Sequence, residues 1–263
     1  MIRVLVTGGT GVLGRRVVDE LRQKGALPRV LSRKMQNAGQ GMEIAQGDLV
    51  ANTGLQEALK DVDVVIHCAH NPQNARENTL ATRNLMEAVR ASGVKHVVLI
   101  SIIGVDRMTF YPYYRAKWQD EQTVIQSGVP YTILRSAQFH DFVGFLIDTL
   151  SKIPLILLPR DLCFQPVQLE PVAEDLAHAA LNPPAGRMRD LAGPEVLTLD
   201  QMIRSYLQAQ GNHKKVYTFP LPLPFITVWK DLSRLDVSRK GETWHQWLSR
   251  QDRIANLYQK ARG

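Results

Sequence analysis

The 263-residue chain has little cysteine and no long apolar run. Its two cysteines, Cys68 and Cys163, lie in segments that we expect to be buried, and so few thiols cannot form the disulfide framework of a small secreted domain. The longest apolar stretch, residues 142–159, is interrupted by charged side chains, so no membrane span is predicted. Because a strand is predicted from residue 2 onward, we expect no signal peptide. These features predict a cytoplasmic protein with reduced thiols.

The chain also lacks a segment in which charge of one sign is concentrated. Its formal net charge is +7, but the basic residues are spread along the sequence, with a moderate excess in residues 230–263. Nucleic-acid-binding proteins usually gather positive charge on one stretch or face. The pattern therefore favours a solvated basic surface that attracts an anionic cofactor, and it argues against a nucleic-acid partner.

Glycine is concentrated near the start of the chain, where residues 6–14 read VTGGTGVLG. This segment follows a short apolar strand and leads into a helix that ends near Gly25, after which a second strand completes a βαβ unit. Without Cβ atoms, Gly8 permits a tight turn, Gly11 lets a pyrophosphate approach the backbone, and Gly14 allows the helix to pack on the strand. The N–H groups at the start of the helix can then bind phosphate. The segment predicts dinucleotide binding, and a purely structural glycine turn is the alternative.

Strands alternate with helices through the first half of the chain, which predicts a right-handed, doubly wound parallel sheet of the Rossmann type. After residue 136 the alternation stops and proline becomes frequent. We therefore expect a nucleotide-binding core over residues 1–136 and a smaller substrate-side subdomain over residues 137–263, interleaved with the core. The expected strands are 2–6, 29–31, 42–47, 62–69, 94–101 and 131–134. The expected helices are 12–24, 55–59, 78–92, 113–127, 142–150, 171–181 and 200–210, the last capped near Asp200, and residues 216–224 are expected to be extended.

The end of the second predicted strand lacks the carboxylate that usually holds the ribose hydroxyls of NAD. Ser32, Arg33 and Lys34 stand there instead, and their hydroxyl, guanidinium and ammonium groups suit a 2′-phosphate. This predicts NADP(H) as the cofactor. The alternative is that the two basic residues form an ordinary solvated loop.

The pattern Thr7-Gly8-x-x-Gly11-x-x-Gly14 resembles the extended and atypical short-chain dehydrogenase/reductases, and among them the NmrA-like NAD(P)-binding proteins. The resemblance implies that Asp48 contacts the adenine ring and that the end of the fourth strand lines the cofactor. It also implies that residues 138 and 139 approach the nicotinamide. Loop capping by Asp48 and ordinary packing of residues 138 and 139 are the alternatives. The complete set of expected cofactor contacts is Gly8, Thr10, Gly11, Val12, Leu13, Gly14, Ser32, Arg33, Lys34, Asp48, Leu49, Ala69, His70, Lys117, Gln138 and Phe139.

Tyr113 and Lys117 lie four residues apart on a predicted helix, and this spacing places both side chains on one helix face. The resembling family keeps its catalytic tyrosine and lysine on the helix that follows the fifth strand, and it uses a serine at the position of Ser101 to orient the substrate carbonyl. Hydride transfer to a carbonyl leaves negative charge on the oxygen, which a tyrosine made more acidic by a neighbouring ammonium can neutralise. Apolar residues after Ser101 and a short gap to Tyr113 depart from the family pattern.

The sequence His67-Cys68-Ala69-His70 has metal-binding residue types, but alternation along a strand sends neighbouring side chains to opposite faces, so no metal site is expected. The second half of the chain is rich in apolar residues that suit a pocket for a small apolar substrate. The first functional hypothesis is an NADPH-dependent reductase of a carbonyl, quinone or similar electrophile. A non-catalytic NADP(H)-binding redox sensor or assembly protein is the second, and a nucleotide-sugar epimerase is the third, disfavoured by the missing carboxylate.

Overall fold

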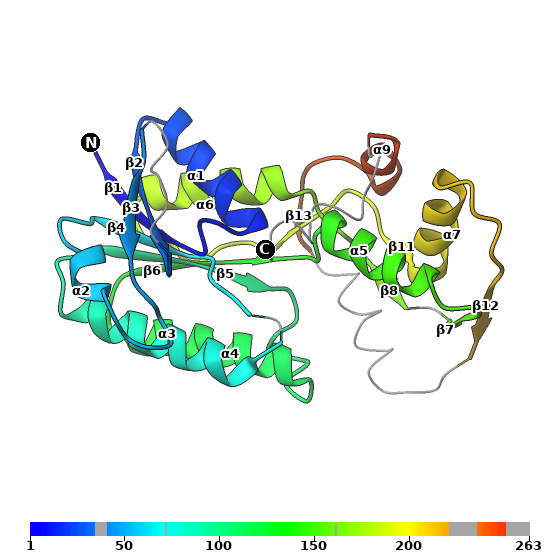
Figure 1. Ribbon diagram of the computed structural model, residues 1–263, viewed down its shortest axis with the longest axis horizontal. Coiled ribbons are helices and arrows are strands. Elements are labelled where there is room, and N and C mark those ends of the chain that lie inside the picture. Colours follow the sequence, from blue (N-terminus) through cyan, green and yellow to red (C-terminus); the bar gives the residue numbers. More distant parts are fainter. Residues whose placement is uncertain (35–40, 72, 161, 221–235, 251–263) are drawn as a thin grey trace. The chain divides into compact units, whose positions relative to one another are not determined.

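The computed structural model describes residues 1–34, 41–71, 73–160, 162–220 and 236–250 (Figure 1). The chain divides into two compact units. The first comprises residues 1–135 and 172–189, and the second comprises residues 136–171 and 190–263. In the part of the chain that the structure describes, no helix combines the length and the apolar character needed to cross a bilayer.

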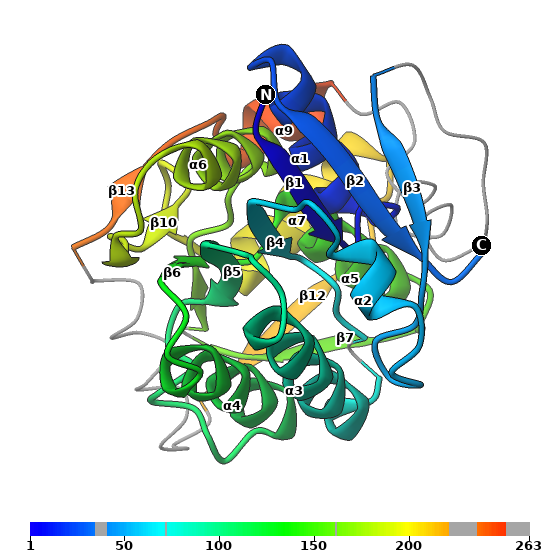
Figure 2. The ribbon, with the colours of Figure 1, turned by 90° about the vertical axis from the view of Figure 1, so that its left-hand side faces the viewer.

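The first unit is built on a parallel sheet with the strand order β6-β5-β4-β1-β2-β3, and β9 also pairs with β6. Helices α1 and α6 lie on one face of this sheet and α3 and α4 on the other (Figures 1 and 2). The predicted doubly wound α/β fold is therefore confirmed. The strands are β1 Arg3–Thr7, β2 Leu27–Ser32, β3 Glu43–Gln46, β4 Val64–His67, β5 His96–Ile102, β6 Tyr131–Ser136 and β9 Gly186–Arg187. The helices are α1 Val12–Gln23, α2 Leu55–Ala58, α3 Ala75–Arg90 and α4 Pro112–Gln126, with α6 Leu169–Leu181 beginning in the second unit.

The core of the first unit lies on both faces of the central strands. All four residues of β4 are buried, as expected for a parallel strand that helices cover on each side. Val65 of β4 packs in one cluster with Leu5 of β1, Leu99 of β5 and Leu85 of α3. Because successive side chains of a strand point to opposite faces, the continuous apolar runs of β4 and β5 can serve both faces at once.

Local capping explains where the helices begin and end. Helix α3 begins at residue 75, three residues before the expected start, because the Asn74 side chain accepts a hydrogen bond from the Glu77 N–H. Gly25 has a φ of +76° after the end of α1, as a helix-terminating glycine requires. The helix expected over residues 200–210, with a cap near Asp200, is capped at Thr198, which forms a capping box with Gln201.

The second unit combines helices with short strands. Its elements are α5 His140–Ser151, β7 Ile156–Pro159, β8 Cys163–Phe164, β10 Leu191–Ala192, β11 Leu197–Thr198, α7 Leu199–Ala209, β12 Val216–Phe219, β13 Ser238–Arg239 and α9 Trp244–Ser249. Strand β12 runs parallel to β7, and β11 pairs antiparallel with β8. Strand β10 pairs with Ser136, the last residue of β6, and β13 pairs with β10. With these two strands the sheet has nine strands in the described residues.

The core of the second unit is formed by α5, α7 and α9. Trp244 and Trp247 stack with their ring centroids 5.0 Å apart, and they pack in one cluster with Ile147 and Tyr206. The two-residue strands of this unit have no periodicity that a sequence could reveal. Residues 221–224 of the expected extended segment, and most of the basic segment 230–263, lie outside the described residues.

Candidate functional site

The glycine turn between β1 and α1 is closed by backbone contacts that no other residue would allow. Gly8 has a φ of +69°, and a Cβ atom on it would lie 2.7 Å from the backbone of Ala69. A Cβ on Gly14 would collide with the Gly8 carbonyl oxygen. Gly9 is the residue that faces β2, because a Cβ there would meet the Val30 side chain at 2.8 Å. Gly14 therefore closes the turn upon itself, whereas the sequence pattern had assigned it to packing of the helix on the strand.

The first turn of α1 offers N–H groups that no acidic residue of the turn itself occupies. Gly11 occupies the N-cap position, no side chain caps the helix, and its first turn contains no acidic residue. The nearby Arg15 donates from Nε to the Thr10 carbonyl oxygen at 2.8 Å. Four N–H groups at a helix start lack partners within the helix, and they carry partial positive charge. The turn thus fits a pyrophosphate in both space and charge, with Thr10, Val12 and Leu13 at its edge.

The ends of β2 and β3 carry the residues expected to contact the adenosine part of the cofactor. Ser32 is buried and its hydroxyl donates to the Lys34 carbonyl oxygen at 2.7 Å, whereas Arg33 and Lys34 are exposed. Asp48 Oδ1 accepts hydrogen bonds from the N–H groups of residues 50 and 51, at 2.7 and 3.0 Å, and so holds its own loop. Leu49 beside it is buried. A contact of Asp48 with adenine stays a prediction.

The end of β4 connects the glycine turn with the helix that carries the predicted catalytic pair. Ala69 lies against Gly8, and the ring of the next residue, His70, contacts Tyr113 edge to face with ring centroids 4.7 Å apart. Asn78 of α3 fixes the loop beyond, since its side chain accepts from the Asn71 N–H and donates to the Asn71 carbonyl oxygen, both at 2.7 Å. The turn, the end of β4 and the start of α4 therefore form one continuous site.

A buried polar network lies beneath this site. His67 Nδ1 is 2.6 Å from Thr7 Oγ1, and His67 Nε2 is 3.1 Å from Thr82 Oγ1. Thr7 Oγ1 also accepts a hydrogen bond from the Ala69 N–H at 3.3 Å. Burial lowers the pKa of His67 to about 3, so its ring is neutral at neutral pH. Both ring nitrogens are engaged by hydroxyl groups, and this histidine serves to join β1, β4 and α3.

The other two titratable groups at the end of β4 are also uncharged at neutral pH. Burial lowers the pKa of His70 to about 2 and raises that of the Cys68 thiol to about 12. Cys68 and Cys163 are free thiols of intermediate burial, so the expected burial holds only in part. Among the described residues, no group of three or more histidine, cysteine and acidic side chains could hold a metal ion.

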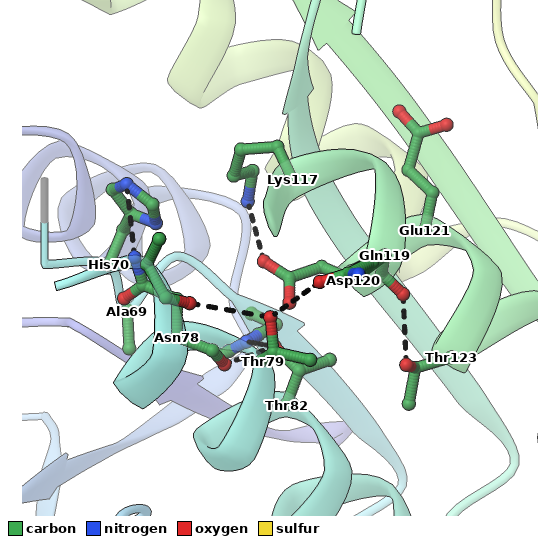
Figure 3. A network of polar contacts seen from close by, with 12 residues as sticks. Ala69, His70, Asn78, Thr79, Thr82, Lys117, Gln119, Asp120, Glu121 and Thr123 are labelled. Atoms are coloured by element: carbon green, nitrogen blue, oxygen red, sulfur yellow. Dashed lines mark hydrogen bonds and ion pairs between the residues drawn. The ribbon is translucent and has the colours of Figure 1, made fainter. Parts of the chain in front are cut away.

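Lys117 lies in the interior of the first unit and pairs with an acid that the sequence analysis did not single out. Its Nζ is 3.7 Å from Asp120 Oδ2, and the two side chains are only 5% and 2% exposed (Figure 3). Burial raises the pKa of Asp120, although the charge on Lys117 opposes that shift. The ammonium also contributes to the low pKa of His70, so its field reaches the end of β4. The spacing of three residues on a helix was the signal that could have revealed the pair.

Ser101, near the end of β5, is the third predicted catalytic residue. It is 1% exposed, and its hydroxyl oxygen has no hydrogen-bond partner within the described part of the protein. A buried hydroxyl without a partner costs free energy, and such groups occur where a ligand completes the hydrogen bonding.

A second acid of α4 forms an ion pair with Arg135 of β6. Arg135 donates from Nε and Nη2 to the two carboxylate oxygens of Glu121, at 2.8 and 2.7 Å, and from Nη1 to Asp106 Oδ1 at 3.0 Å. Its guanidinium also lies over the Trp118 ring, 5.7 Å from the centroid. This arrangement holds α4 against β6 and against the loop that follows β5. Glu121 and Asp106 were not anticipated from the sequence.

Gln138 and Phe139 belong to the second unit, where they directly precede α5. The Gln138 carbonyl oxygen accepts a hydrogen bond from the Val167 N–H at 2.9 Å, and Phe139 is the N-cap residue of the helix. These contacts account for their backbone positions. An approach of either side chain to a nicotinamide stays a prediction.

Comparison with known proteins agrees with this geometry. Residues 8–144, more than half of the chain, match the protein family described as NAD(P)H-binding. A (4-alkanoyl-5-oxo-2,5-dihydrofuran-3-yl)methyl phosphate reductase from Streptomyces griseus is 31% identical over 223 residues, which are 80% of this chain and 74% of that protein. Photosystem II assembly factor Ycf39 of Trieres chinensis is 27% identical over 234 residues, 83% of this chain and 72% of the relative.

Among solved structures, an NADPH-dependent quinone oxidoreductase from Escherichia coli, complexed with NADPH, is similar with a TM-score of 0.74. The two are 19% identical, and the similarity covers 94% of this chain and 98% of the other. At that identity the likeness concerns the fold. The family match confirms NAD(P)H as the class of cofactor, and the contacts predicted for the glycine turn stay predictions.

Proposed function

Because this chain belongs to the NAD(P)H-binding family, we propose that it is an NADPH-dependent oxidoreductase that transfers hydride to a small apolar carbonyl, quinone or similar electrophile. The observation that carries the proposal is the convergence of three elements on one site. Gly8 of the nucleotide turn lies against Ala69, and His70, the next residue, lies against Tyr113 of α4. A catalytic side chain must lie close to the cofactor that it serves, and this arrangement meets that requirement.

The residues of the first unit fit the cofactor. The N–H groups at the start of α1 would bind the pyrophosphate, and Ser32, Arg33 and Lys34 would favour the 2′-phosphate of NADP(H) over a free ribose hydroxyl. Ala69 and His70 would line the site beside the glycine turn. When bound, the nicotinamide supplies the hydride.

Three side chains would complete the reaction. Ser101 has a buried hydroxyl that can donate to the substrate oxygen, and this would orient the carbonyl group. Tyr113 would donate a proton from its hydroxyl group to the same oxygen, so that no full negative charge remains there. Lys117 carries the positive charge that makes a phenol more acidic, and it would also bind the nicotinamide ribose.

Two relatives support a reductase. The Streptomyces protein is a reductase by name, and the Escherichia coli protein is a quinone oxidoreductase. Within the family, we assign the chain to the NmrA-like group on the strength of its Thr7–Gly14 turn, and we place the protein in the cytoplasm.

The test begins with titration of the purified protein with NADPH and NADH, followed by nicotinamide fluorescence. A panel of carbonyls and quinones is then added while oxidation of the reduced nicotinamide is measured. We expect preferential NADPH binding and turnover of at least one panel member. Tyr113→Phe should lower kcat by about 10²- to 10⁴-fold with little change in NADPH affinity, because the variant loses a proton donor. Tyr111→Phe, at an exposed neighbouring tyrosine, is the matched control and should retain activity.

A second function has a specific observation in its favour. The Lys117–Asp120 ion pair offsets the positive charge that a catalytic tyrosine needs nearby. A protein that binds NADP(H) without turning it over, and acts as a redox sensor or an assembly factor like Ycf39, would tolerate such a pair. NADPH binding with no oxidation by any panel member would favour this alternative, and failure to bind either nucleotide would refute both.

A further inference from the structure

We propose that Asp120 is a positioning residue that holds the Lys117 ammonium and reduces the acidity of Tyr113. The inference rests on the proposed function, since it concerns the same catalytic helix. It assigns a role to a carboxylate that hydride transfer itself does not require. Asp120 would act through Lys117, and not by contact with substrate.

The geometry of the ion pair supports this role. At 3.7 Å, the Lys117 Nζ to Asp120 Oδ2 distance exceeds that of a charge-assisted hydrogen bond, so the pair is mainly coulombic. Asp120 Oδ1 is buried and has no hydrogen-bond partner in the residues that the structure describes. Tyr113, Lys117 and Asp120 stand at positions i, i+4 and i+7 of α4, which lie on one helix face. A charge on either neighbour is therefore felt at Tyr113.

A network of buried polar side chains lies beside Asp120. Thr82 lowers the pKa of Asp120, against the larger effect of burial. Thr82 Oγ1 lies 3.1 Å from His67 Nε2 and donates to the Asn78 carbonyl oxygen at 3.1 Å. With Nε2 protonated, the neutral His67 ring donates to Thr82 and accepts at Nδ1 from the Thr7 hydroxyl, 2.6 Å away. Thr7 is the residue before Gly8. The position of Asp120 is thus linked through buried side chains to the start of the nucleotide turn.

The buried titratable groups that surround this pair, among the described residues of β4 and α4, are neutral or paired at neutral pH. At the end of β4, His67 and His70 are neutral and Cys68 is protonated, because burial shifts the pKa of each of them. On α4, Glu121 is the other buried acid, and Arg135 neutralises it by a two-pronged contact. Lys117 and Asp120 are therefore the charged side chains on the Tyr113 face of α4 that we expect to influence its hydroxyl group.

The test is an ultraviolet titration of Asp120→Asn, which removes the charge while keeping the shape. The phenolate signal of Tyr113 is isolated by subtracting the titration of the same protein carrying Tyr113→Phe. Loss of the carboxylate leaves the ammonium unopposed, so we expect the acid ionisation constant of Tyr113 to rise about tenfold. Asp120→Glu restores the charge and should restore the original constant.

The matched control is Glu20→Gln, which removes the acid of another helical ion pair, 3.8 Å from Lys24 on α1, and should leave Tyr113 unchanged. If Asp120→Asn does not fold, Asp120→Ser provides the same comparison. An unchanged ionisation constant of Tyr113 would overturn the inference. A lowered constant would also overturn it, because it would mean that Asp120 serves to keep Lys117 protonated.

This experiment needs no substrate, so it separates the two proposals. A protein that shows the expected shift but oxidises no NADPH would contradict the proposed function while supporting the role of Asp120. An active reductase whose Tyr113 does not respond to Asp120→Asn would contradict the role of Asp120 alone.

Discussion

Helix α4 carries two buried ion pairs at adjacent positions, and they differ in how completely they are satisfied. Glu121 receives two hydrogen bonds of 2.8 and 2.7 Å from Arg135, which in turn also binds Asp106. Asp120 lies 3.7 Å from Lys117, and its second oxygen has no partner among the described residues. In the Glu121–Arg135 pair, hydrogen bonds satisfy both carboxylate oxygens. In the Lys117–Asp120 pair the charges are less completely compensated, so they can act on neighbouring groups.

Buried polar residues of β4 and β5 also differ in how completely their hydrogen bonds are satisfied. His67 uses both ring nitrogens in hydrogen bonds to threonine hydroxyls. Ser101 lies at the carboxyl end of β5, and its hydroxyl lacks a partner within the described residues. Completeness of hydrogen bonding thus distinguishes the polar groups that hold the first unit together from those that are available to a ligand.

The largest effect on stability is expected from Glu121→Gln. The change leaves the Arg135 guanidinium buried at 3% side-chain exposure without its main counter-ion, so we expect a loss of about 3–5 kcal/mol in the free energy of unfolding. Urea unfolding followed by circular dichroism measures it. Asp120→Asn, which breaks the looser pair, is the comparison and should cost less. An equal or greater cost for Asp120→Asn would remove the distinction between the two pairs.

A pH effect of similar size is expected from His67. Its pKa is about 3 in the folded protein and near the ordinary 6.5 when unfolded, so only the unfolded chain takes up a proton as the pH falls below 6.5. Stability is therefore present above pH 6.5 and is lost progressively below it, by about 3 kcal/mol at pH 4. Unfolding measurements across this range should show a shallower decline for His67→Gln. Identical slopes for the two proteins would contradict the buried neutral ring.

Ser101→Ala should stabilise the protein slightly, in contrast to the losses expected from the changes at Glu121 and His67. The substitution removes a buried hydroxyl that has no partner in the described structure, so we expect the free energy of unfolding to rise by about 1 kcal/mol. Turnover should fall, because the substrate oxygen loses a donor. Thermal unfolding of the variant without added nucleotide provides the measurement. A clear destabilisation would indicate that the hydroxyl supports the fold.

The smallest change is expected at an ion pair near the surface. Glu43 lies 2.7 Å from Arg29 Nε, but its side chain is 34% exposed, so water and salt screen the interaction. Glu43→Gln should lower the free energy of unfolding by less than about 1 kcal/mol. Comparison of Glu43→Gln with Glu121→Gln tests whether burial of an ion pair, and not its short distance alone, determines how much free energy of unfolding is lost when the pair is broken.

The regular elements of the first unit could be predicted because their signals are local. The apolar runs of β4 and β5, and helix-ending glycines such as Gly25, place strands and helices to within a few residues. The two-residue strands of the second unit could not be found, since pairing with distant segments alone defines them. Lys117 was predicted as a site residue, but its partner was not, because a spacing of three residues permits a contact without requiring one.

By itself, the sequence determined the doubly wound sheet, the glycine turn and the basic residues at the end of β2. Each depends on residues that are neighbours in the chain, so apolar periodicity, glycine spacing and the missing carboxylate can be recognised directly in the sequence. Tertiary structure alone decided which polar groups are satisfied. His67 meets a threonine 60 residues away, and Arg135 meets Asp106 across 29 residues. Such partners are selected by packing of the whole sheet, and they determine which charges remain available for chemistry.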